Sequence, residues 1–148
     1  MLNELQVGEF LAALGERTPS PASGAATALT GALAAGLAEL AARFVGDQEA
    51  IMKAKASVMR LLELADEDSA AYEAFMADRN DETRARIVAV PEEIAAHSDE
   101  IAALAESLRS RLSSSVAGDA EASLELARAA ARVARRLADL NRPPSCRR

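Results

Sequence analysis

The sequence predicts an all-α protein, an antiparallel bundle of about five helices around a central helix of small residues. Half of the 148 residues are hydrophobic but only 3% are aromatic, so the core must consist of Ala, Leu, Val and Ile. Apolar residues recur at spacings of three and four along most of the chain, which is typical of helices. Residues 25–36 are mostly Ala, Gly and Leu, and such small side chains let helices pack at short distance.

The first helix is expected to run from Asn3, whose side chain can cap it, to Gly15. Its expected buried face consists of Val7, Phe10, Leu11 and Leu14. A rigid loop follows, in which Pro19 and Pro21 exclude helix. Each proline fixes its own φ and pushes the preceding residue out of the α region.

The central helix is expected to start after this loop, with Ser20 or Ser23 as its cap and Gly24 leaving its first turn without a side chain. The free N–H groups of that turn can bind a polar or anionic ligand. A binding site is therefore predicted at the proline loop. We expect the helix to be buried, and its small residues to serve packing. Its apolar stripe is Leu29, Leu33, Leu37, Leu40 and Phe44, and its other faces hold Gly31, Gly36 and alanines.

The third helix is predicted between Asp47, a cap that follows a helix stop at Gly46, and Asp78. Its apolar face continues over many turns. This helix is long for a small domain, so we expect part of it to pack against a second copy of the chain, in a homodimer.

The remaining helices are delimited by prolines and glycines. Residues 79–82 interrupt the third helix, a short helical piece follows, and Pro91 is expected at the first position of the next helix. Gly118 is the expected stop of that helix. A last helix is predicted from Ala120 to Leu140, so that residues 1–141 form one domain and residues 142–148 form a C-terminal tail.

Charge and composition exclude several classes of function. A net charge of −6 argues against nucleic acid, which needs a basic surface. No apolar run reaches the length of about 18 residues that a membrane span needs, and the N-terminus carries acids instead of the basic start of a signal peptide, so a cytoplasmic protein without membrane contact is expected. The single cysteine, Cys146, excludes an internal disulfide, and one histidine leaves no recognisable metal site.

Asp68 and Tyr72 lie four residues apart on the third helix and therefore share a face, which is the apolar one. A carboxylate beside an apolar stripe is a candidate for catalysis. In the alternative interpretation, Asp68 is one of three solvated acids in a row and Tyr72 is an aromatic residue at the edge of the core.

Residues 18–40 resemble the opening of the formimidoyltetrahydrofolate cyclodeaminase and methenyltetrahydrofolate cyclohydrolase family. The family pattern is a TPxPGGGS loop that leads into an AAxAGALAAALAEMV helix. Pro19, Pro21 and Gly24 match the prolines and the last glycine of the loop. Two earlier glycines and the serine of the pattern are replaced by Ala22, Ser23 and Ala25.

Further motifs extend the resemblance to most of residues 7–137. The family's Asp before an Ala-Tyr pair is intact in DSAAY, residues 68–72, and VPEEIA at residues 90–95 matches the opening of a long helix. Near the C-terminus, Asp119, Leu124 and Glu125 take the places of the family's asparagine, serine and aspartate.

The resemblance implies a cyclohydrolase or cyclodeaminase of one-carbon metabolism that acts on a tetrahydrofolate derivative without a metal. It implies catalytic roles for Asp68 and Glu125. The two carboxyl groups are expected to share one cleft, where burial beside a second carboxylate should raise the pKa of one of them. The implied substrate-binding residues are Pro21, Ser23, Gly24, Tyr72 and Asp119. Two alternatives remain because the site is substituted: an inactive member of the fold that binds a folate or another small anionic ligand, and a purely structural helical dimer.

Overall fold

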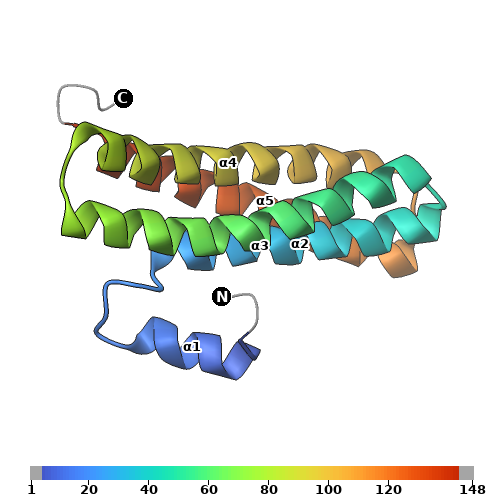
Figure 1. Cartoon of the computed structure of the whole chain (residues 1–148). Helices are drawn as coiled ribbons and strands as arrows, with labels where there is room; N and C mark the ends of the chain where they lie inside the picture. The colour runs from blue at the N-terminus through green and yellow to red at the C-terminus, as the bar shows by residue number, and fades with distance from the viewer. Residues whose placement is uncertain (1–4, 144–148) are drawn as a thin grey trace.

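The computed structural model describes residues 5–143, and over these residues it is built from five α-helices and contains no strand (Figure 1). The predicted all-α fold class is confirmed. The helices are α1 (Val7–Gly15), α2 (Ser23–Val45), α3 (Gln48–Ala77), α4 (Asp81–Arg109) and α5 (Ser114–Asn141).

Helices α2 to α5 form an antiparallel four-helix bundle, and α1 lies beside it (Figure 1). The three loops within the bundle contain two to four residues, so each helix packs against the one before it. Only Phe10 of α1 is buried, whereas Val7 and Leu11 are exposed, so the expected buried face of the first helix is only partly confirmed.

The α2–α3 junction follows the prediction. Gly46 ends α2 in the left-handed conformation with a φ of 78°, which glycine adopts without a steric penalty. Asp47 then caps α3 by accepting a hydrogen bond of 3.0 Å from the backbone N–H of Ala50.

Helix α2 is central, as predicted, but it buries its small face instead of its leucine stripe. The buried residues include Ala25, Ala28, Ala35 and Ala38, whereas Leu33, Leu40 and Phe44 are exposed. Alanine permits the closest approach of three neighbouring helices, and this is why the larger side chains are turned outward. The helix also meets the length and hydropathy criteria for a membrane span, contrary to our expectation, although 56% of that window is buried in the bundle.

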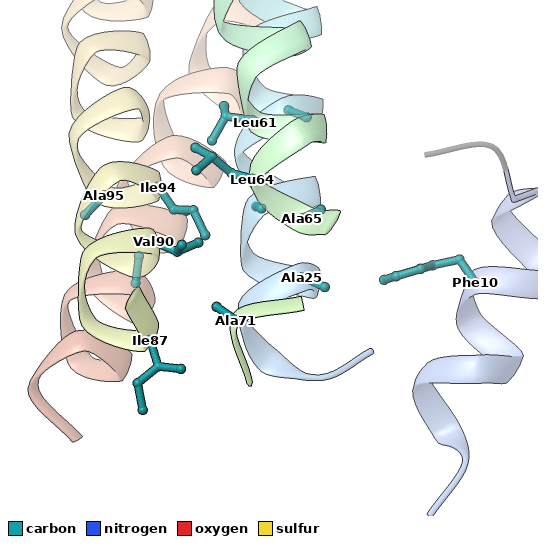
Figure 2. Close-up of a cluster of buried hydrophobic side chains, with 13 residues drawn as sticks. Phe10, Ala25, Leu61, Leu64, Ala65, Ala71, Ile87, Val90, Ile94 and Ala95 are labelled. Atoms are coloured by element: carbon teal, nitrogen blue, oxygen red, sulfur yellow. The ribbon is translucent and has the colours of Figure 1, made fainter. Parts of the chain in front are cut away.

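The core follows the length of the bundle in three clusters of buried residues. The first cluster lies at the end of the bundle where α2 begins. Figure 2 shows Leu61 and Leu64 of α3 beside Val90 and Ile94 of α4, with Phe10 reaching toward the bundle from α1.

Two predicted helix boundaries in the second half were wrong. Pro91 lies inside α4, which starts ten residues earlier behind a capping box formed by Asn80 and Thr83. Gly118 lies inside α5, which starts at Ser114. Each residue lowers helix propensity, but packing of the whole helix against its neighbours outweighs that local cost.

Candidate functional site

A cleft of about 360 Å³ opens at the end of the bundle where α2 begins. It is formed by the loop before α2, the first turn of α2, the C-terminal half of α3, the first turns of α4 and the last turns of α5. Its lining residues are Thr18, Pro19, Ser20, Ala22, Ser23, Gly24, Asp68, Ser69, Tyr72, Ile87, Pro91, Leu137 and Asn141.

Asp68 is the acid of this cleft, and it lies against the first turn of α2. The N-cap residue of α2 is Ala22, which has no side chain to bond the free N–H groups. The carboxylate of Asp68 supplies this function from α3, because it accepts a hydrogen bond from the backbone N–H of Ala25. Our prediction that Ser20 or Ser23 caps α2 was therefore wrong.

Gly24 makes this approach possible. A β-carbon added at position 24 would lie 2.0 Å from Oδ1 and 2.2 Å from Cγ of Asp68, so any side chain here would displace the carboxylate. The glycine that we predicted to leave the first turn bare therefore makes room for a side chain from another helix.

Burial raises the pKa of the Asp68 carboxyl above its ordinary value, and the hydrogen bond from Ala25 partly opposes this shift. The acid is only half-buried, so it still meets the cleft. A carboxyl group with a raised pKa in a cleft can give up and take back a proton, which is the property that a general acid–base catalyst requires.

The other walls of the cleft differ in character. Ile87, Pro91 and Leu137 form an apolar wall from α4 and α5. Tyr72 is 38% exposed, one helical turn after Asp68. The hydroxyl of Ser69 donates to the carbonyl of Ala65 in its own helix, at 3.4 Å.

Four of the predicted site residues meet in the cleft: Ser23, Gly24, Asp68 and Tyr72. Pro21 is not one of the lining residues, although Ser20 and Ala22 on either side of it are. Its peptide bond with Ser20 is cis.

Glu125 and Asp119 lie elsewhere on α5. Glu125 is twelve residues before Leu137, which places it about 18 Å along the helix from the cleft at about 1.5 Å per residue. Its side chain is 62% exposed and pairs with Arg128 at 3.2 Å. Asp119 is farther still. The expectation that Glu125 and Asp68 share one cleft was therefore wrong for the single chain, because the stretch of α5 between Glu125 and Leu137 keeps Glu125 away from the cleft.

Sequence reasoning missed Ile87, Leu137 and Asn141 as lining residues and placed Pro91 only as a helix start. Pro91 became a signal only once the structure placed it inside α4, because a helix-interior proline leaves a carbonyl group four residues earlier without its usual partner. Within residues 5–143, no group of three or more His, Cys, Asp or Glu side chains is arranged to hold a metal ion.

Comparisons with known proteins agree with this architecture. A model of the formiminotransferase-cyclodeaminase family matches residues 6–143. The fold is similar to that of a formiminotetrahydrofolate cyclodeaminase from Thermotoga maritima, with a TM-score of 0.90 and 22% sequence identity. The alignment covers 95% of this chain and 80% of that one. No match was found among curated proteins.

Proposed function

The chain belongs to the formiminotransferase-cyclodeaminase family, and from this premise we propose that its cleft binds a tetrahydrofolate derivative and catalyses the cyclodeaminase reaction. The observation that carries the proposal is Asp68, a half-buried acid with a raised pKa at the wall of the cleft. A cyclohydrolase reaction is the second candidate, because it needs the same acid–base group.

The proposed chemistry closes a ring and releases ammonia. The N10 nitrogen of formiminotetrahydrofolate attacks the carbon of the protonated formimino group (N5–CH=NH₂⁺), whose nitrogen thereby becomes an amino group, and the Asp68 carboxylate takes the proton that N10 loses. The protonated acid then donates this proton to the departing amino group, so that the carbon–nitrogen bond breaks and ammonia leaves. The cationic methenyl product is stabilised by the carboxylate that remains.

One carboxyl group performs both proton transfers in this scheme. Glu125 lies outside the cleft of its own chain, so the scheme assigns it no role. A raised pKa suits the double role, because it brings the carboxyl group closer to the pH range in which it can both take up and give up a proton.

The first turn of α2 supports binding of the polar or anionic part of the ligand. Asp68 bonds the N–H of Ala25, and Ala22 has no polar side chain to cap the remaining N–H groups at the N-terminus of this 23-residue helix, which carries a partial positive charge. Ser23 and Gly24 line the cleft at this turn, so their backbone N–H groups are the proposed donors.

We further propose that the protein is a homodimer through the exposed face of α2. The leucine stripe that the bundle leaves uncovered includes Leu33, which is 66% exposed, and Phe44, which is 62% exposed. An apolar groove of about 850 Å³ runs between this face and α1. An exposed apolar surface of this extent is typical of a protein–protein interface, and a second copy of the same stripe offers an equally apolar surface.

The function is tested by incubating the purified chain with formiminotetrahydrofolate and following both the methenyl product and ammonia. We expect both products from the wild type and neither from Asp68→Asn. Glu63→Gln is the matched control, because it removes an exposed carboxylate from the same helix, and it should retain wild-type activity. Tetrahydrofolate binding without turnover of formimino or methenyl substrates would instead indicate an inactive binding protein.

A further inference from the structure

One wall of the cleft contains a hydrogen-bonded arrangement of three residues: Pro91, Ile87 and Asn141. Pro91 is fully buried in the interior of α4 and has no N–H group, so the carbonyl of Ile87 lacks its helical partner. The side chain of Asn141, at the last residue of α5, replaces that partner. Its Nδ2 donates a hydrogen bond of 2.7 Å to the carbonyl oxygen of Ile87.

This hydrogen bond determines how the amide of Asn141 is oriented. A carbonyl oxygen can only accept, so the NH₂ group of the amide must face Ile87 and its oxygen Oδ1 must be turned away. Oδ1 has no hydrogen-bond partner within residues 5–143, and it is not a buried atom. All three residues line the cleft. This arrangement therefore leaves Oδ1 of Asn141 as a hydrogen-bond acceptor of fixed orientation at the cleft.

We propose that Asn141 is a specificity-determining residue whose Oδ1 accepts a hydrogen bond from a ring N–H of the bound ligand. This inference rests on the proposed function. Asn141 offers an acceptor at the cleft, and the pterin ring of a tetrahydrofolate carries several N–H donors whereas its glutamate tail carries carboxylate acceptors, so the pterin ring is the part that suits Asn141. The first turn of α2 offers donors and Asn141 offers an acceptor, so the two sites select different parts of one ligand.

The anchoring of Asn141 by its hydrogen bond to the carbonyl of Ile87 is tested on the free protein, with a double-mutant cycle of Asn141→Ala and Pro91→Ala. Pro91→Ala restores an N–H group that can bond the carbonyl of Ile87 within the helix. We therefore expect Asn141→Ala to lower the melting temperature clearly in the wild-type background and much less in the Pro91→Ala background. Equal losses in both backgrounds would overturn the anchoring role.

The recognition role is tested by calorimetric titration with two probes, tetrahydrofolate and p-aminobenzoylglutamate, which lacks the pterin ring. Asn141→Ala should weaken tetrahydrofolate binding by about three- to tenfold, the value of one hydrogen bond, and leave binding of the fragment unchanged. Equal weakening of both probes would show a purely structural role and overturn the proposal.

The two proposals fail in different ways. If the wild type binds tetrahydrofolate and Asn141→Ala binds it equally well, the recognition role is wrong and the proposed function stands. If the wild type binds no tetrahydrofolate, the proposed function fails and the recognition role fails with it. The melting temperatures still show whether Asn141 is anchored by the carbonyl of Ile87.

Discussion

Asp68 of α3 occupies the space that a side chain at Gly24 of α2 would fill, with only 2.0 Å between its Oδ1 and the position of an added β-carbon. The carboxylate thereby reaches the N–H of Ala25 and caps a helix whose own N-cap residue, Ala22, has no polar side chain. One contact thus connects the packing of two helices with the protonation of the candidate catalytic acid.

Gly24→Ala should displace the Asp68 carboxylate and lower the rate of the cyclodeaminase reaction. A displacement of about 1 Å can cost about 10²-fold in rate. The fold should survive, because alanine is favoured over glycine by about 1 kcal/mol in a helix. The measurement is kcat for formiminotetrahydrofolate together with the melting temperature. Gly118→Ala is the control, since a β-carbon there meets nothing within 4 Å; equal rates in the two variants would contradict the prediction.

Asp68→Asn should make the protein more stable at neutral pH while removing its activity. The folded-state pKa of Asp68 is raised, so the folded state binds more protons than the unfolded state above the ordinary value of 3.8. Stability therefore falls as the pH rises from that value through the folded-state pKa. The asparagine does not titrate and keeps an acceptor for the N–H of Ala25.

This second prediction is checked by urea unfolding of the wild type and Asp68→Asn between about pH 4 and pH 8, a range that starts near the ordinary pKa of Asp. The difference in unfolding free energy should grow in favour of Asp68→Asn as the pH rises, and then level off. A difference that does not change with pH would mean that Asp68 is not desolvated in the fold.

Gly31→Leu should destabilise the bundle. Gly31 is buried in α2, and an added β-carbon would lie 3.0 Å from Oγ of Ser98 and 3.3 Å from the methyl groups of Leu61. Overpacking of this kind costs about 1–3 kcal/mol. Denaturant unfolding measures the loss, and Gly118→Leu is the matched control in the open part of α5. An unchanged midpoint for Gly31→Leu would show that α2 can move away from α3 and α4 at no cost.

Replacing two residues of the exposed stripe, in the double variant Leu33→Glu and Phe44→Glu, should convert the proposed homodimer into a folded monomer. Both side chains are mostly exposed in the single chain, so charges there do not disturb the bundle itself. They would repel each other across a dimer interface, where buried charges without partners are costly. Sedimentation should give a dimer for the wild type and for Ala103→Lys, a control at an exposed position of α4. A monomeric wild type would refute the dimer.

Local signals in the sequence were sufficient for the elements that depend on short-range chemistry. Gly46 and Asp47 could be assigned because a left-handed stop and a capping carboxylate act on adjacent residues. The proline loop and the DSAAY segment indicated the right end of the bundle, since both contribute residues to the cleft.

Packing between helices decided the rest. The sequence by itself determined a helical bundle, its small-residue central helix and an acid at Asp68, because these follow from composition, periodicity and motif. Only the tertiary structure decided that α2 buries its alanines, that Pro91 stays within α4, that Asn141 supplies the missing partner of Ile87, and that Glu125 lies far from Asp68. Each of these depends on which faces of separate helices meet, and a periodic pattern shows that a helix has faces without showing which neighbour will cover them.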